Sequence, residues 1–229
     1  MRAGDVVYSF DELFQATLIK RVNRFLALVD QEGTIRKCHL HDPGRIPELT
    51  PGTPLLIRKT RGKKTDCSIT AFLNARTWVI ADSRIHSDVA SAFLPPSARR
   101  EVRIGDSRLD FAYDDTYAEV KGCTLVIDGK ALFPDAPTKR GLKHVNELTR
   151  LKLEGHSSEL LVLIMRDDAL CFAPNEKTDP SFSRAFWEAL GAGVRVRSLK
   201  FRLSGNEVVF AGEIPLCRQP LKSEGPNIS

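Results

Sequence analysis

Residues 108–121 read Arg-Leu-Asp-Phe-Ala-Tyr-Asp-Asp-Thr-Tyr-Ala-Glu-Val-Lys, two alternating runs on either side of a polar pair, Asp114-Asp115. Alternating runs around a two-residue polar break are typical of a β-hairpin. A turn at this pair predicts four opposed pairs of residues: Tyr113 with Thr116, Ala112 with Tyr117, Phe111 with Ala118, and Asp110 with Glu119.

Side chains alternate between the two faces of a strand, and directly opposed residues share a face. One face of the hairpin is therefore expected to be charged, with Arg108, Asp110, Glu119 and Lys121. The other is expected to be apolar, with Leu109, Phe111, Ala118 and Val120. Two opposed carboxylates repel unless a cation lies between them. The candidate cations are Arg108, Lys121 and a bound Mg²⁺, which prefers oxygen ligands.

An Asp, a following strand with Glu-x-Lys and an apolar reverse face resemble the core of PD-(D/E)xK nucleases. The resemblance implies that Asp110 and Glu119 hold Mg²⁺, or Mn²⁺ as a substitute, and that Lys121 stabilises the attacked phosphate or positions water. A metal ion in such a site polarises the phosphoryl oxygen and lowers the pKa of bound water. A structural hairpin with a surface salt-bridge cluster has the same spacing, so spacing alone does not separate the two interpretations.

A longer pattern surrounds this hairpin. Glu-Val-Lys-x-x-Thr-Leu at 119–125 is followed by Phe-Pro-Asp-Ala-x-Thr-x-Arg-Gly-x-Lys-His-x-x-Glu-Leu at 133–148. Upstream, Arg24-Phe25 precedes Asp-Pro-Gly-Arg at 42–45, and then Glu-Leu and Pro-Gly. These motifs closely resemble the sugar fermentation stimulation protein (SfsA) family, with Asp42 where the family has Asn. The resemblance implies DNA binding, an OB-like N-terminal domain and a PD-(D/E)xK-like C-terminal domain.

The expected fold class is α+β, with an N-terminal OB-like β-barrel followed by a nuclease-like mixed sheet flanked by helices. Residues 1–81 are assigned to the barrel and residues 82–229 to the nuclease-like domain. The first part is rich in short strand candidates separated by Gly and Pro turns, as in small barrels: 6–10, 14–28, 34–40, 54–59, 67–73 and 77–80.

Three helices, one of them over residues 180–190, and one buried strand are expected in the second part. Asp82 is a candidate cap for a helix to Leu94, and Thr138 for a helix to about Glu154. The apolar run 160–165 predicts a strand buried on both faces. Family members carry a Glu late in the first of these helices, where this chain has Ala90-Ser91-Ala92. Asp88 and Glu101 are the candidate replacements, and the absence of that acid weakens the case for catalysis.

The net charge of +5 permits a polyanionic partner. Candidate phosphate contacts are mostly clustered cations, together with a helix N-terminus that favours anions: Arg24, Arg45, Arg58, Lys59, Arg61, Lys63, Lys64, Arg108, Thr138, Lys139, Arg140, Lys143 and His144. Other interpretations stay open, because Lys143 is also placed to pair with Glu147. His144 either fills a structural role or shares a helix face with Glu147 and reaches the metal region. Phe25 is either a core residue or, with Arg24, a stacking surface.

The five cysteines are scattered and form no Cys-x-x-Cys pair, which predicts neither a zinc site nor a disulfide framework. No apolar run is long enough to cross a bilayer, and the N-terminus lacks the apolar stretch of a signal peptide. The expectation is a cytoplasmic protein with no membrane partner.

The first functional hypothesis is binding to double-stranded DNA with little sequence preference, mainly through backbone phosphates. RNA stays open as a partner, because an OB-like fold and basic clusters serve both nucleic acids. The second hypothesis is a divalent-metal-dependent nuclease with Asp110, Glu119 and Lys121 as its site. A regulatory role in sugar metabolism is suggested by the family name alone. The oligomeric state is left open.

Overall fold

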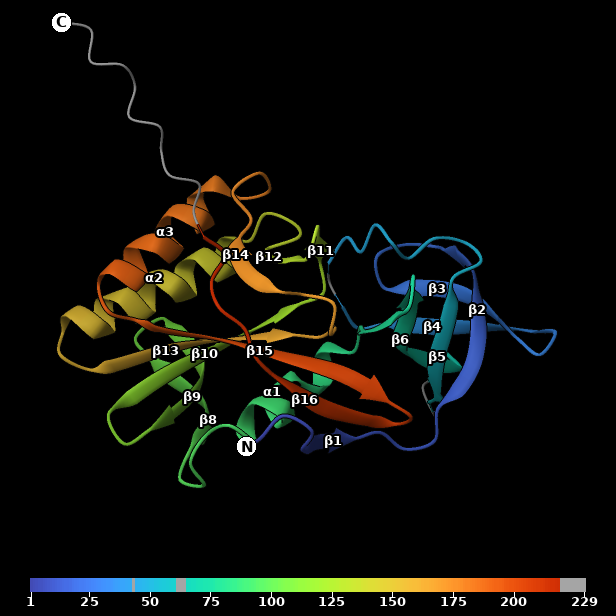
Figure 1. The fold of residues 1–229 in the computed structure, drawn as a ribbon, viewed down its shortest axis with the longest axis horizontal. Coiled ribbons are helices and arrows are strands. Elements are labelled where there is room, and N and C mark those ends of the chain that lie inside the picture. The colour runs from blue at the N-terminus through green and yellow to red at the C-terminus, as the bar shows by residue number, and fades with distance from the viewer. Residues whose placement is uncertain (43, 61–64, 219–229) are drawn as a thin grey trace, which may run out of the picture.

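The structure is a computed structural model that describes residues 1–42, 44–60 and 65–218. A barrel built from N-terminal strands lies beside a larger sheet that is covered by helices (Figure 1). This arrangement confirms the α+β class. Within the described residues, no helix is long and apolar enough to span a membrane.

The barrel comes from a six-stranded sheet in the order β4-β3-β2-β5-β6-β7. An additional parallel pairing of β4 with β6 closes strands β2 to β6 on themselves. Alternate side chains point inward and form one apolar cluster, which includes Leu18, Val29, Ile57 and Phe72. The OB-like barrel is therefore confirmed. Its strands are β2 (Phe14–Arg21), β3 (Leu26–Gln31), β4 (Thr34–Leu40), β5 (Pro54–Lys59), β6 (Cys67–Asn74) and β7 (Thr77–Ile80).

The first strand, β1 (Val6–Ser9), lies outside this barrel. It pairs antiparallel with β16 (Glu207–Glu213), close to the other end of the chain. The alternation in the sequence predicts a strand at 6–10 but carries no information about its partner. The chain thus starts in the larger sheet, crosses to the barrel and returns.

The larger sheet has seven strands in the order β1-β16-β15-β13-β10-β9-β8. Its centre, β10-β13-β15, is parallel, and its outer strands are antiparallel. The apolar strand β13 is buried on both faces, as predicted, because Leu160 and Val162 enter one core cluster and Leu161 and Leu163 the other. The remaining bounds are β8 (Arg99–Ile104), β9 (Ser107–Tyr113), β10 (Thr116–Cys123), β13 (Ser157–Ile164) and β15 (Arg195–Ser204).

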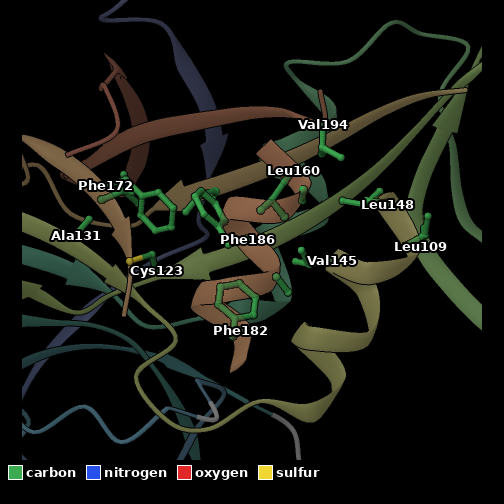
Figure 2. Packing of buried hydrophobic residues seen from close by; sticks show 14 of the residues in the cluster. Leu109, Cys123, Ala131, Val145, Leu148, Leu160, Phe172, Phe182, Phe186 and Val194 are labelled. Carbon is green, nitrogen blue, oxygen red and sulfur yellow. The ribbon is translucent and has the colours of Figure 1, made fainter. Parts of the chain in front are cut away.

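Helices α2 (Lys139–Leu153) and α3 (Pro180–Gly191) cover one face of this sheet (Figure 1). Figure 2 shows Val145 and Leu148 of α2 and Phe182 and Phe186 of α3 in the shared core. The Thr138 side chain caps α2 by accepting from Gly141 N, and the helix ends at Leu153, so the predicted helix is confirmed.

The helix predicted from Asp82 is shorter than expected. Asp82 caps a 3-10 turn, Ser83–Ile85, which leads into α1 (His86–Ser91). Val89 and Ala90 of this helix pack into the second core cluster, on the opposite side of the sheet from α2. A small third sheet completes the fold, with β11 (Val126–Ile127), β12 (Lys130–Phe133) and β14 (Cys171–Pro174).

Four of the cysteines are paired, so the prediction of no disulfide framework is wrong. Cys38 of β4 bonds to Cys67 of β6, and Cys171 bonds to Cys217, with Cα–Cα distances of 4.5 and 4.9 Å. The first pair joins the two strands whose parallel pairing closes the barrel. Cys38 and Cys67 are far apart in the sequence and meet only because the barrel closes. The spacing of the cysteines does not reveal this closure. Cys123 is free and buried, and burial raises the pKa of its thiol to about 12.

Candidate active site

The predicted hairpin forms with the predicted register near its turn. Tyr113 faces Thr116, Ala112 faces Tyr117, and Phe111 faces Ala118. The regular pairing ends there, because the Asp110 side chain accepts a hydrogen bond from Val120 N at 2.8 Å. The Asp110 carboxylate thus accepts the hydrogen bond from Val120 N in place of a backbone carbonyl of the neighbouring strand.

Because the regular pairing ends at Asp110, the residues before it do not lie on the faces of the sheet that the alternation predicts. Leu109 was expected beside Phe111, but it lies on the α2 side of the sheet, near Leu148 (Figure 2). Phe111 is in the opposite cluster, because strand alternation does not continue regularly across Asp110. Arg108 also departs from expectation, since it is exposed and lies 3.6 Å from Glu101. Arg108 is therefore not the cation that offsets the two acids.

Lys121 and His144 take that place beside Glu119. Glu119 Oε1 accepts from Lys121 Nζ and from His144 Nδ1, and these two nitrogens are 3.5 Å apart. Glu119 and His144 are only 1% and 5% exposed. Glu119 and Lys121 come from β10, and His144 comes from the buried face of α2, whose core residues fix its rotation. The helix thereby holds one oxygen of a buried carboxylate.

The other oxygen, Glu119 Oε2, is buried and has no hydrogen-bond partner in the part of the chain that the structure describes. Buried carboxylate oxygens are normally paired, since an unpaired one keeps the cost of losing water. A hard cation such as Mg²⁺ binds through one or two carboxylates and completes its shell with water and substrate phosphate. The donor set of Asp110 and Glu119 fits such an ion.

The pKa values of the two acids are shifted in opposite directions. Burial, followed by the charge of Glu119, raises the pKa of Asp110. Burial also acts to raise the pKa of Glu119, but the hydrogen bond from His144 and the charge of Lys121 outweigh it and lower that pKa. Glu119 thus remains a carboxylate over a wide pH range, and a cation beside Asp110 would favour its ionised form.

The predicted phosphate-binding residues fall into three groups. Seven are exposed: Arg24, Arg45, Lys59, Arg108, Lys139, Arg140 and Lys143. Three of these seven also make contacts within the protein, because Lys59 lies over the Phe14 ring at 4.3 Å, Arg108 lies beside Glu101, and Lys143 Nζ donates to Asp106 O at 2.8 Å. Three lie outside the described residues: Arg61, Lys63 and Lys64. The other three are bonded within the protein: Arg58 to Asp82, Thr138 as the α2 cap, and His144 to Glu119.

The N-terminus of α2 is partly occupied by the chain itself. Thr138 N donates to Asp179 Oδ2 at 2.9 Å, and Gly141 N donates to Thr138 Oγ1. Asp179 also caps α3 through Phe182 N, so one carboxylate joins the starts of both helices. Two of the four amides that a helix start exposes are therefore used, which leaves those of Lys139 and Arg140 for a phosphate.

Phe25 is a surface residue rather than a core residue. Its side chain is 45% exposed and lies parallel to the His39 ring, with 6.1 Å between ring centroids and an interplanar angle of 5°. The neighbouring Arg24 is exposed as well. An exposed ring beside a cation is the arrangement that OB-fold proteins use to stack nucleobases.

Sequence reasoning missed the residues that join the two domains. Arg166 is 2% exposed and donates to Glu48 Oε1 of the barrel at 2.8 Å, as well as to Asp168 and to Thr124 O. Arg45 N donates to Asp135 Oδ2 at 2.9 Å across the same junction. The only signal in the sequence was that Arg45, Glu48, Thr124 and Asp135 fall within the motifs of the family resemblance.

The missing acid is not replaced at the site. Asp88 is half exposed and pairs with Arg100 at 2.7 Å, and Glu101 is exposed beside Arg108. Among the described residues, no group of three or more His, Cys, Asp or Glu side chains is arranged to hold a metal. Any ion here therefore relies on Asp110 and Glu119, together with water or substrate oxygens.

Comparisons with known proteins agree with this geometry. Residues 19–81 match the model of the SfsA N-terminal OB domain, and residues 78–207 match that of the sugar fermentation stimulation protein RE domain. Relatives called sugar fermentation stimulation protein homologs include those of Saccharolobus solfataricus and Thermoplasma acidophilum. The first is 51% identical, over 96% of this chain and 93% of its own. The second is 47% identical, over 91% and 94%.

A solved structure is similar over nearly the whole chain. It is described as Pyrococcus furiosus SfsA in complex with Ca²⁺, with a TM-score of 0.85 and 26% sequence identity. The match covers 93% of this chain and 100% of that one. Both domains, their order and their sequence motifs are thus shared, and the chain belongs to the sugar fermentation stimulation protein family.

Proposed function

We propose that this protein binds DNA through its backbone phosphates and hydrolyses it with a divalent metal ion at Asp110 and Glu119. The observation that carries the proposal is the state of Glu119. One of its oxygens is held by Lys121 and His144, while the other is buried without a partner in the described chain. A carboxylate fixed in this way is preorganised for a ligand that the protein alone does not supply.

The residues of the candidate site would have the following roles. Asp110 and Glu119 hold the ion, and His144 fixes the orientation of Glu119 from the buried face of α2. Lys121 lies against Glu119 and also lines a pocket open to solvent, so its ammonium can reach an oxygen of the attacked phosphate. Mg²⁺ or Mn²⁺, when bound, polarises that phosphate and lowers the pKa of the attacking water.

The similar structure from Pyrococcus furiosus supports a divalent cation, because it is described as a complex with Ca²⁺. Calcium and magnesium are both hard cations that bind carboxylate oxygens. Calcium carries the same charge as magnesium, so its binding by a relative is consistent with Mg²⁺ or Mn²⁺ as the working ion here.

The proposed DNA contacts lie on exposed cations of both domains. Arg24 and Arg45 extend from the barrel, and Lys139, Arg140 and Lys143 extend from the first turns of α2. Such contacts bind the phosphate backbone regardless of base sequence and weaken as salt increases. Double-stranded DNA is the proposed partner because it carries one negative charge per about 1.7 Å of helix axis, a higher charge density than that of a single strand.

A second candidate is DNA binding without hydrolysis. It is favoured by the missing third acid, since Asp88 and Glu101 each lie beside an arginine away from Glu119. In this case the hairpin would be a former nuclease site whose residues now only maintain the fold.

One experiment separates the two candidates. Labelled blunt, single-stranded and flapped DNA is incubated with the protein, with and without Mg²⁺ or Mn²⁺, and binding is measured in parallel in EDTA. We expect metal-dependent cleavage that is lost in Asp110→Asn and in Glu119→Gln. Asp88→Asn, an exposed acid outside the site, is the matched control and should cleave like the wild type.

Binding of all DNAs without cleavage by the wild type would favour the second candidate. Cleavage that survives both site substitutions would place the activity elsewhere and overturn the proposed site. If no DNA bound at low salt, both candidates would be wrong.

A further inference from the structure

A pocket of about 340 Å³ lies between the barrel and the larger sheet. Arg24, Asp42 and Gly44 line it from the barrel, and the end of β10 and the loop before α2 line it from the other domain. Its volume falls in the range of small-molecule binding sites, which often form at domain interfaces. Because Lys121 is among its lining residues, the pocket opens directly beside the candidate active site.

Two carboxylates from different domains meet at this pocket. Asp135 Oδ2 accepts from Arg45 N at 2.9 Å and packs so closely on Gly44 that a Cβ there would come within 2.0 Å of it. Asp42 Oδ1 accepts from Gly44 N at 2.8 Å, and its Oδ2 accepts from Thr124 Oγ1 at 3.3 Å. Backbone amides and a neighbouring hydroxyl thus hold both acids in place, and only glycine fits between them.

The rest of the lining is largely apolar. Leu125, Leu132, Phe133 and Pro134 contribute hydrocarbon surface, and the His86 ring lies so close to Gly122 that no Cβ fits between them. Burial, followed by the charge of Asp135, raises the pKa of Asp42 to about 6, against a hydrogen bond from Gly44 N that lowers it. The carboxylates therefore face a space of low polarity.

The carboxylates and the apolar surface of the pocket determine which ligand it can bind. Two carboxylates repel a phosphate, so the side of the pocket at Asp42 and Asp135 does not suit the DNA backbone, whereas Arg24 and Lys121, which also line the pocket, favour it. A nucleobase is flat and apolar on its faces and carries N–H donors on its edge, which carboxylates accept. Enzymes that take a base out of a duplex read it in the same way, with hydrogen bonds to its edge and apolar contacts to its faces.

The position of Lys121 connects the pocket to the strand being attacked. Lys121 contacts Glu119 and lines the pocket, and Thr124 follows it by three residues, about 10 Å along the strand. A phosphate at Lys121 therefore brings the neighbouring nucleotide to the mouth of the pocket. A base inside a duplex is paired and stacked, so only an unpaired or flipped nucleotide can place its base in such a pocket.

We propose that this pocket takes the base of one unpaired nucleotide, whose donor edge bonds to Asp42 and Asp135 while its phosphate lies at Lys121. The protein would then prefer DNA with unpaired nucleotides over blunt duplex, and unpaired guanine, with two adjacent donors, over thymine. This inference rests on the proposed DNA binding and adds the substrate class.

The test compares affinities in EDTA for a blunt duplex and for duplexes with three unpaired nucleotides at the 3′ or the 5′ end, all with equal numbers of phosphates. Because a bound base adds to the affinity of the phosphate contacts, we expect the wild type to bind one overhang polarity about 10-fold more tightly than the blunt duplex. Ala136→Trp, which fills the pocket, should remove this preference without weakening blunt-duplex binding.

Two further variants complete the test. Ala192→Trp, at a half-buried alanine that ends α3 away from the pocket, is the matched control and should keep the preference. Asp135→Asn retains an oxygen for Arg45 N but loses the charge, so it should reduce the guanine-over-thymine ratio even if Ala136→Trp does not fold.

The outcomes separate this inference from the proposed function. Equal wild-type affinity for blunt and overhanging DNA would overturn the inference and leave DNA binding intact. An overhang preference that survives Ala136→Trp in a folded protein would also overturn the inference and leave DNA binding intact. So would equal wild-type affinities for guanine and thymine overhangs. Failure to bind any DNA at low salt would overturn the proposed function and the inference with it.

Discussion

The domain junction and the outer face of α2 use their charged residues in different ways. At the junction, Arg166 is bonded to Glu48 and Asp168, and Arg58 is bonded to Asp82. On α2, Lys139 and Arg140 are exposed, and Lys143 Nζ donates to Asp106 O at 2.8 Å. Both regions contribute to the net charge of +5, but Arg166 and Arg58 are bonded within the protein, whereas the exposed Lys139 and Arg140 are available to a partner.

This difference shows that a basic cluster in the sequence is not by itself a binding surface. Arg58 and Lys59 belong to the densest run of cations in the chain, yet Arg58 pairs with a buried carboxylate and lies 4.9 Å from the Phe10 ring centroid. Substitutions at the junction should therefore change stability, while substitutions on α2 should change DNA affinity.

The largest effect is expected from Arg166→Ala. The substitution leaves Glu48, Asp168 and the Thr124 carbonyl without their shared donor, and breaking a buried ion pair costs about 3–5 kcal/mol. Urea denaturation measures the loss in the free energy of unfolding. Arg184→Ala, at an exposed position of α3, is the control and should change it by less than about 0.5 kcal/mol. Equal effects of the two substitutions would mean that the junction contacts add nothing.

Asp42→Asn should have a smaller effect that depends on pH. The folded protein raises the pKa of Asp42 to about 6, above its value in the unfolded chain. Its contribution to stability is therefore fully present below about pH 4 and is lost as the pH rises to about 6. Asparagine avoids this loss and keeps an acceptor for Gly44 N, so the variant should be more stable than the wild type at pH 8 by about 2–3 kcal/mol.

Free energies of unfolding measured from pH 4 to pH 8 check this prediction. The difference between Asp42→Asn and the wild type should close towards pH 4. Asp167→Asn, at an exposed turn after β13, provides the comparison for a simple loss of charge. A constant difference across the range would show that the effect does not come from titration of Asp42.

The smallest effects concern the salt dependence of DNA binding. Lys139→Met and Arg140→Met should each reduce the slope of log affinity against log salt by about 1, with little change in melting temperature. Arg58→Met should do the opposite, lowering the melting temperature and leaving the slope unchanged, because its guanidinium is held by Asp82. A reduced slope for Arg58→Met would make it a phosphate contact and remove the distinction between the two regions.

Local patterns in the sequence determined much of the fold. The alternation around Asp114-Asp115 predicts the three ladder pairs nearest the turn, and the cap at Thr138 predicts the start of α2. These features depend on residues within a few positions of one another, where hydrogen bonds and strand alternation leave few choices. Asp110, Glu119 and Lys121 were chosen as candidate site residues from the same local pattern and the family motifs around it.

Tertiary structure decided what these residues contact. The sequence did not show that β1 pairs with β16, that Cys38 meets Cys67, or that the ladder ends at Asp110. Nor did it show that His144 fixes Glu119, or that Asp42 and Asp135 share a pocket. Each of these contacts joins segments far apart in the chain. Their formation depends on how the barrel closes and packs against the sheet, and that is set by the sum of many buried contacts rather than by any short pattern.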